Sequence, residues 1–175
     1  AILDLRGLQS GGDSAIIGWM QGFLQTEDWV QARELFARRN SGLGWSDGMS
    51  PAGTVDVGCS EGRWYENTTP LVVLVDDCTG CPGEQAVNTL RQVENVVLVG
   101  TNTAGEMLCP GNIQIYLPSS GVCVAFGDYL MLEADGSSIE YRGYEPDVWC
   151  DSRDGVSKAL AMLTVAGTIG EADAA

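Results

Sequence analysis

Two cysteines three residues apart carry the most evident chemistry of the chain. Cys78 and Cys81 lie in the segment Cys-Thr-Gly-Cys-Pro, directly before a stretch of helical character. A thiol at the start of a helix is shifted toward the thiolate by the positive end of the helix dipole, and the thiolate is the nucleophile. The same spacing also suits a disulfide, zinc ligation or thiol–disulfide exchange. The segment therefore predicts sulfur chemistry of one of these kinds.

The rest of the composition narrows the choice among these kinds of sulfur chemistry. The chain has no histidine and no second Cys-x-x-Cys pair, so a set of four zinc ligands is not expected, and no metal or cofactor is predicted. The βαβ context of a thioredoxin-like exchange centre is also missing. Lysine occurs once, at Lys158. A basic partner for a nucleophile is therefore scarce within the chain itself.

Length and charge restrict the class of protein. A chain of 175 residues is long enough for one sizeable core, and its net charge of −15 argues against nucleic-acid partners, which require Lys and Arg to neutralise phosphates. No apolar run approaches the roughly 18 to 20 residues that span a membrane. An even number of cysteines, six, favours disulfides in an extracellular or periplasmic compartment. Because the chain opens on a strand-like run without Met, we expect an N-terminal portion to lie outside it.

Hydrophobic periodicity predicts the elements that position these residues. An α/β domain is expected over residues 1–165, followed by a flexible acidic tail, 166–175. A helix beginning at Asp13 or Ser14 has one apolar face, and residues 29–38 read as a second, amphipathic helix. Residues 40–67 are rich in Gly, Ser, Asp and Pro and are predicted to form a surface excursion or flap.

The cysteine pair falls between a predicted strand and a predicted helix. A β-branched run at 71–75 indicates a buried parallel strand, and Pro82 suits the first position of a helix. Other strands are expected at 2–5, 96–100, 112–117, 121–127 and 129–132, with helices at 82–92 and 154–165. This order of elements predicts a mixed sheet with flanking helices.

Motifs in a fixed order resemble the core of the tail-specific (C-terminal processing) serine proteases. The segments are ILDLRG with GG at 11–12, LVVLVDDCTGCPGE at 71–84, VLVGTNTAG at 97–105, and LPSSG at 117–121 with EYRGYEPD at 140–147. The resemblance covers about residues 1–165. It implies a ClpP/crotonase-like fold, in agreement with the α/β prediction.

The resemblance also implies roles for particular residues. Cys81 stands where the family has its nucleophilic serine, and Glu140 stands at the carboxylate of the Ser–His–Glu, tricorn-core-like version. The histidine of that version precedes residue 1, so it would come from the N-terminal portion, packed on this chain. Oxyanion and substrate-binding roles are implied for Gly11, Gly12 and Gly83.

Two departures from the family pattern affect the expected activity. The Ser–Lys version is excluded, because Glu106 occupies the lysine position and Lys158 lies in the terminal helix. Pro82 follows Cys81 and has no N–H, although the family uses the amide at this place as an oxyanion donor. Losing one such donor costs roughly 10² to 10³ in rate. A Cys-for-Ser change together with this loss indicates a weakened enzyme.

Two main functions remain open at this point. In the first, the chain is a peptidase domain that hydrolyses peptide bonds by acyl transfer, with Cys81 as nucleophile and peptide or unfolded protein as substrate. In the second, it is a catalytically weakened or inactive homologue that binds peptides. A disulfide between Cys78 and Cys81, or thiol exchange through them, is the competing interpretation of the cysteine pair.

Overall fold

The computed structural model describes the greater part of the chain. The described residues are 1–9, 13–24, 29–31, 34–40, 45–51, 54–56, 69–91, 93, 95–107, 113–126, 129–132 and 137–167. The predicted tail therefore lies almost wholly outside them. Among these residues, no helix has both the length and the apolar character needed to cross a bilayer.

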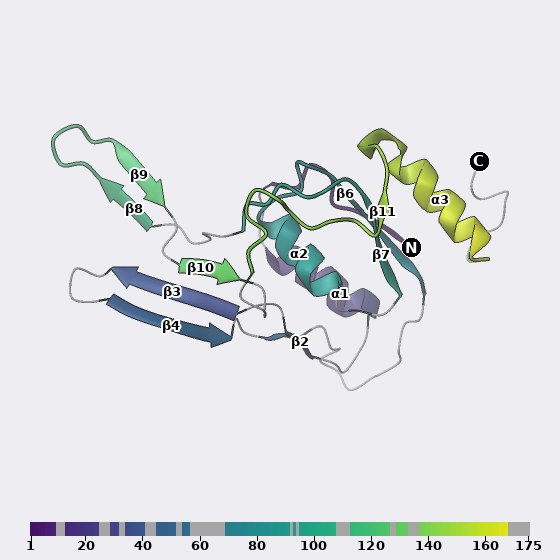
Figure 1. Ribbon diagram of the computed structural model, residues 1–175, viewed down its shortest axis with the longest axis horizontal. Helices are drawn as coiled ribbons and strands as arrows, with labels where there is room; N and C mark the ends of the chain where they lie inside the picture. Colours follow the sequence, from purple (N-terminus) through teal and green to yellow (C-terminus); the bar gives the residue numbers. More distant parts are fainter. Residues whose placement is uncertain are drawn as a thin grey trace.

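A parallel four-stranded sheet forms the centre of the molecule (Figure 1). Its strand order is β1-β6-β7-β11, and every neighbouring pair is parallel. All five residues of β6 are buried because both faces of the sheet are covered. The strands are β1 (Ile2–Asp4), β6 (Leu71–Val75), β7 (Val96–Gly100) and β11 (Val148–Trp149).

Helices cover the two faces of this sheet. Helices α1 (Asp13–Leu24) and α2 (Pro82–Leu90) pack on one face, where Met20, Val87 and Val73 belong to the larger hydrophobic core. Helix α3 (Gly155–Val165) follows a short 3-10 turn, Ser152–Asp154, and packs on the opposite face. The α/β class with flanking helices is thus confirmed.

The apolar face predicted for the first helix is confirmed at the positions described. Met20 is buried, and Ile16 and Phe23 pack against the same core. Trp19 remains 37% exposed and stacks on Phe23, with ring centroids 5.0 Å apart. The alternation of buried and exposed positions follows the helical period, so the local hydrophobic pattern was sufficient to predict this face of the helix.

The helix predicted at 29–38 is wrong. Residues there form strands β2 (Trp29–Gln31) and β3 (Glu34–Asn40). Strand β3 pairs with β4 (Trp45–Pro51) and with β10 (Tyr129–Leu132), which lies about 95 residues further along the chain. Such distant pairing overrides a weak local preference. Within the predicted surface excursion, the described residues from 45 on form β4 and β5 (Thr54–Asp56), the latter paired with β2. The other residues between 41 and 67 lie outside the described ranges, so the flap stays a prediction.

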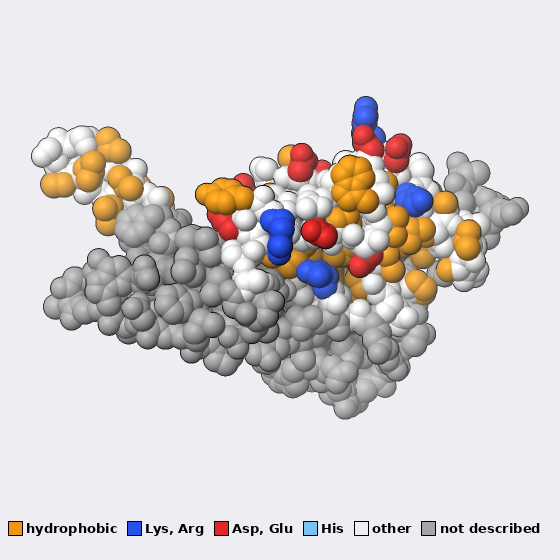
Figure 2. All heavy atoms as spheres, in the orientation of Figure 1, with side chains coloured by type: hydrophobic (Ala, Val, Ile, Leu, Met, Phe, Trp, Pro, Cys, Tyr) orange, Lys and Arg blue, Asp and Glu red, His pale blue; other side chains and the backbone are white. Residues whose placement is uncertain are grey.

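A two-stranded hairpin projects from the body of the molecule. Strands β8 (Ile113–Tyr116) and β9 (Cys123–Phe126) pair in antiparallel register and lie within the strands predicted at 112–117 and 121–127. Figure 2 shows hydrophobic side chains on this hairpin, away from the central sheet. Their members include Ile115, Leu117, Val122 and Val124, each at least 39% exposed. The antiparallel strands therefore lie outside the parallel sheet.

Candidate active site

Cys81 sits at a sharp bend between a central strand and a helix. The chain leaves β6 at Val75, turns through residues 76–80 and enters α2 at Pro82. Cys81 has φ 42° and ψ −104°, a backbone conformation that residues other than glycine rarely adopt. Its side chain is exposed. A strained residue between strand and helix is the geometry that presents a nucleophile in hydrolases with a nucleophile elbow. The backbone thus exposes the thiol to solvent at the end of the sheet.

The turn before Cys81 is tied to the end of β1. Thr79 is fully buried, and its hydroxyl lies 3.0 Å from the carbonyl oxygen of Leu5, to which it donates. The Asp76 carboxylate accepts hydrogen bonds from the backbone N–H groups of Gly7 at 2.9 Å and Cys78 at 3.1 Å. These bonds hold the cysteine turn against the segment that leads toward Gly11 and Gly12. Both of those glycines lie outside the described residues, so their oxyanion role stays a prediction.

The first turn of α2 offers few free backbone donors beside Cys81. Pro82 has no N–H, and the N–H of Gly83 donates to the Gly80 carbonyl at 2.9 Å. A Cβ on Gly83 would approach Thr79 Cγ2 at 2.8 Å and the Leu8 carbonyl oxygen at 2.9 Å. Glycine is therefore needed there for close packing. The substrate-binding role of Gly83 stays a prediction.

Glu84 is the buried anchor of the site, which the sequence did not reveal. Its side chain has no solvent exposure and accepts hydrogen bonds from the Thr103 hydroxyl at 2.5 Å and from the N–H groups of Gly105 at 2.7 Å and Glu106 at 2.8 Å. Thr103 Oγ1 in turn accepts the N–H of Tyr144 at 2.7 Å. The carboxylate therefore fixes the turn after β7 to the first turn of α2. The only sequence signal was an acid in the first turn of a helix.

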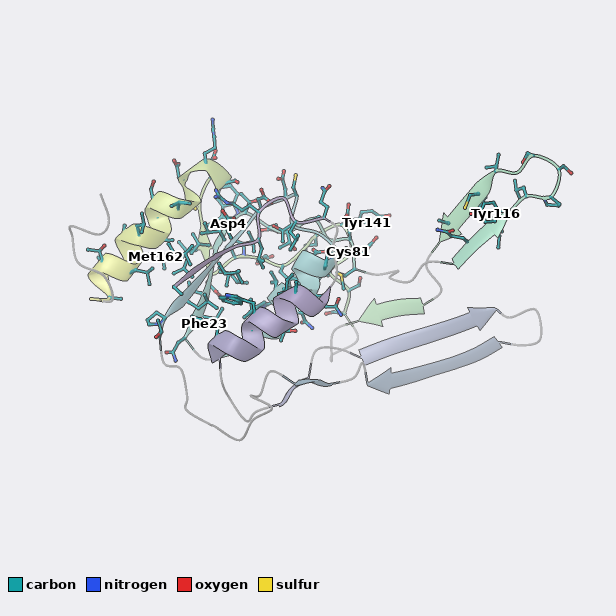
Figure 3. The ribbon with its side chains drawn as sticks, turned by 180° about the vertical axis from the view of Figure 1, so that it is seen from behind. Asp4, Phe23, Cys81, Tyr116, Tyr141 and Met162 are labelled. Carbon is teal, nitrogen blue, oxygen red and sulfur yellow. The ribbon has the colours of Figure 1, made fainter. Side chains whose placement is uncertain are left out.

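The segment that contains Glu140 packs on the same turn. Gly105 has φ +74°, and a Cβ there would meet the Ile139 carbonyl oxygen and the Tyr141 nitrogen, both at 2.7 Å. The Tyr141 N–H donates to the Gly105 carbonyl at 2.9 Å. Glu140 is half-buried between these two contacts. Residues 139–141 thus reach the carboxyl end of the sheet, where Figure 3 shows Tyr141 and Cys81 at the same end of the core.

A second carboxylate approaches the cysteine turn more directly. The Cβ position of Gly80 lies 2.7 Å from Glu106 Oε2 and 3.3 Å from the Ala104 Cβ. Glu106 therefore lies next to the residue that precedes Cys81, at the position where the resemblance would put a lysine. The pKa of the Cys78 thiol is raised, chiefly by the charge of Asp77, with smaller contributions from desolvation, Asp76 and Glu106. The surroundings of the cysteine pair are acidic.

An open pocket of about 600 Å³ lies beside the cysteine turn, at the ends of β7 and β11. It shares Asp77 and Ala104 with the surroundings of that turn. Two exposed aromatic side chains belong to it, Tyr141 at 93% and Trp149 at 70% exposure. Its lining also includes Asn102, Arg142 and Asp151. The pocket therefore combines aromatic surface with polar groups, as ligand-binding pockets do.

Cys78 and Cys81 are not joined by a disulfide in this structure, so the disulfide interpretation of the pair stays a prediction. No disulfide joins any of the four cysteines within the described ranges, which are Cys78, Cys81, Cys123 and Cys150. Cys59 and Cys109 lie outside those ranges. Nor do three or more His, Cys, Asp or Glu side chains gather into a possible metal site in the part of the chain that the structure describes.

Solved structures share this fold. The chain matches a proposed peptidase from Parabacteroides merdae with a TM-score of 0.67 and 22% identity, covering 93% of this chain and 51% of that one. It matches a lipoprotein from Streptococcus agalactiae with a TM-score of 0.63 and 16% identity, covering 94% and 54%. It matches mature CPAF with a TM-score of 0.69 and 12% identity, covering 95% and 44%. The chain thus spans about half the length of these structures. No curated protein sequence matches it.

The comparison with family models is more specific than these likenesses of fold. The model described as peptidase family S41 matches residues 1–149, most of the chain. This range includes the strand–turn–helix bend at Cys81, the Glu84 anchor and the segment of Glu140. The matched range agrees with the resemblance to tail-specific proteases drawn from the motifs, and the chain belongs to peptidase family S41.

Proposed function

We propose that this chain is the core of a peptidase that cleaves peptide bonds through Cys81. The Cys81 thiolate attacks the carbonyl carbon of the scissile bond, a proton passes to the departing amine, and water then hydrolyses the thioester to regenerate the thiol and release the acid. A histidine from an N-terminal portion outside this chain acts as the base, and Glu140 orients it. The Gly12 N–H, beside Gly11, contributes to the oxyanion hole.

The observation that carries this proposal is the backbone at Cys81. A positive φ costs a residue with a side chain about 1 to 3 kcal/mol and persists where the surrounding structure enforces it. Here the hydrogen bonds of Asp76 and Thr79 on one side and helix α2 on the other enforce it. A cysteine kept only for packing needs neither this strain nor exposure. The arrangement therefore favours a reactive thiol.

The pocket supports a peptide or protein substrate. Its lining includes Asp77 and Ala104, which lie beside the cysteine turn, and the aromatic residues Tyr141 and Trp149. A peptide held at Cys81 would extend over Ala104 into this space, where aromatic side chains provide contact area at low entropic cost. An open site of this kind leaves room for an extended chain.

Peptide hydrolysis by the full protein that contains this chain tests the proposal. Cys81→Ala removes the attacking atom and is expected to abolish cleavage of an unstructured peptide, measured by mass spectrometry of the products. Cys123→Ala is the matched control, because Cys123 is also exposed but lies on the projecting hairpin. Cleavage that persists in Cys81→Ala, or that is lost equally in both variants, would contradict the role of Cys81.

A second function is favoured by one observation, the proline at the start of α2. Pro82 leaves Cys81 without the adjacent amide donor, and Gly83 donates to Gly80 instead. A family member with a weak oxyanion hole would retain its pocket and bind peptides with little turnover. Pro82→Ala restores an N–H at this position and is expected to raise the cleavage rate. Peptide binding without cleavage in both forms would favour the binding function.

The setting of the protein is part of the same proposal. An N-terminal portion that supplies the histidine would have to pack near Cys81 and Glu140, at the carboxyl end of the sheet. The six cysteines favour an extracellular or periplasmic location. Fractionation of the native host, with immunodetection of the chain, would test the location directly.

A further inference from the structure

We propose that Cys78 and Cys81 form a reversible disulfide that blocks the active-site thiol under oxidising conditions. The effect of this bond on activity rests on the proposed role of Cys81 as the nucleophile. The formation of the bond itself does not. In the structure described here the two cysteines are not bonded to each other, which corresponds to the reduced form.

The course of the backbone brings both thiols to the surface of one turn. Cys78 and Cys81 are exposed, whereas Thr79 and Gly80 between them are buried. Two hydrogen-bonded turns meet in this stretch, one closed by the Thr79 N–H on the Asp76 carbonyl and one by the Gly83 N–H on the Gly80 carbonyl, each at 2.9 Å. The backbone therefore enters the core at Thr79 and Gly80 and is back at the surface at Cys81. Three residues span at most about 10 Å when extended, so two cysteines within a turned stretch of this length are closer than that, and a disulfide needs Cα atoms about 4.4 to 6.8 Å apart.

Different surroundings give the two thiols different roles. Cys81 precedes helix α2, whose N-terminal dipole favours a thiolate. Cys78 lies beside Asp77, and the charge of that carboxylate is the main reason why the pKa of the Cys78 thiol is raised. Cys81 is therefore the thiol that reacts first, and Cys78 is the thiol that completes the bond.

The reaction needs an oxidant, for which a low-molecular-weight disulfide is sufficient. The Cys81 thiolate attacks one sulfur of that disulfide and releases one small thiolate, which leaves a mixed disulfide on Cys81. The Cys78 thiolate then attacks Cys81 Sγ and releases the second small thiolate. In total, the two protein thiols lose two electrons and two protons, and the small disulfide is reduced to two thiols. A dithiol reductant reverses both steps.

Oxidised glutathione added to the reduced full protein tests the bond, with peptide mapping by mass spectrometry. In the wild type, the peptide that contains residues 78–81 is expected to lose two hydrogen atoms and carry no adduct. In Cys78→Ser, a glutathione adduct is expected to remain on Cys81. Cys123→Ser is the matched control and should behave as the wild type. A stable adduct on Cys81 in the wild type, or no reaction at either cysteine, would overturn the proposal.

Two further measurements separate this proposal from the peptidase proposal. Asp77→Asn removes the main cause of the raised Cys78 pKa, so release of glutathione from a mixed disulfide already formed on Cys81 should be several-fold faster near neutral pH; an unchanged rate of this release would remove Cys78 as the resolving thiol. The reduced wild type is also treated with an acylating peptide probe. Acylation of Cys81 without a disulfide would refute only the redox proposal, whereas a disulfide without acylation would refute only the peptidase proposal.

Discussion

Two turns meet at the carboxyl end of the central sheet, and they are built in opposite ways. The turn at 103–106 is closed by the buried Glu84, whose carboxylate receives three hydrogen bonds. The turn at 76–81 ends in an exposed, strained Cys81. The first turn is satisfied internally, whereas the second presents its reactive atom to solvent. The comparison indicates that the site combines one turn held by internal hydrogen bonds with one turn that exposes its thiol.

The largest stability effect is expected at the Glu84 anchor. Glu84→Ala leaves the Thr103 hydroxyl and two backbone N–H groups without their acceptor inside the protein, so the free energy of unfolding should fall by about 3 kcal/mol or more. Chemical unfolding followed by circular dichroism measures this loss. Glu145→Ala is the matched control, because Glu145 is exposed, and it should change stability little. Equal effects would show that Glu84 is no anchor.

A somewhat smaller effect is expected at Gly105. Gly105→Ala combines the strain of a positive φ with close contact of the new Cβ to Ile139 and Tyr141, so we expect a loss of about 2 to 4 kcal/mol. Gly121→Ala is an informative partner, since Gly121 has φ +70° and no atom within 4 Å of its Cβ position. That variant should lose only the conformational part, about 1 kcal/mol. Similar losses at both sites would contradict the packing of 139–141 on the 103–106 turn.

A substitution in the cysteine turn, residues 76–81, is expected to lower the free energy of unfolding by less. Thr79→Val keeps the shape of a buried side chain but removes the hydroxyl that donates to Leu5, so stability should fall by about 1 to 2 kcal/mol. Cleavage by the full protein should fall further than this loss explains, because the bend at Cys81 depends on the turn. If the variant were less stable but cleaved peptides as fast as the wild type, cleavage would not depend on the hydrogen bond that Thr79 makes in this turn.

The smallest effect concerns the rim of the pocket. Two hydrogen bonds from the Arg153 side chain and one from its N–H lower the pKa of Asp151 from 3.8 to about 2. A lowered carboxyl pKa gives a contribution to stability that is present above about pH 4 and is lost as the pH falls toward 2. NMR titration should show the Asp151 pKa returning toward 3.8 in Arg153→Ala. An unchanged titration would rule out Arg153 as the cause.

Local pattern was sufficient for the part of the fold that carries Cys81. The run at 71–75 and Pro82 predicted β6 and the start of α2, since continuous apolar residues and a helix-starting proline are local signals. Strand β3 was missed because its partners include β10, far along the chain. Strand β11 was missed because two residues are too short for any period.

The same distinction, between local signals and contacts of distant segments, explains which site residues could be predicted from the sequence. Cys81 and Glu140 were singled out through ordered motifs, and their catalytic roles remain predictions. The anchoring role of Glu84 has no local signal beyond an acid in the first turn of a helix, because its partners lie 19 to 22 residues away and their approach depends on the sheet. The roles of Gly11 and Gly12 remain predictions.

The most direct measurement of the central claim is the trapping of a covalent intermediate on the full protein. An activated acyl-peptide is added to the reduced protein, the reaction is quenched with acid, and the modified residue is located by peptide mapping. The account predicts a thioester on Cys81 that disappears with time and is absent in Cys81→Ala. Cleavage of a peptide with no acyl group ever found on Cys81, or acylation at another cysteine only, would contradict it.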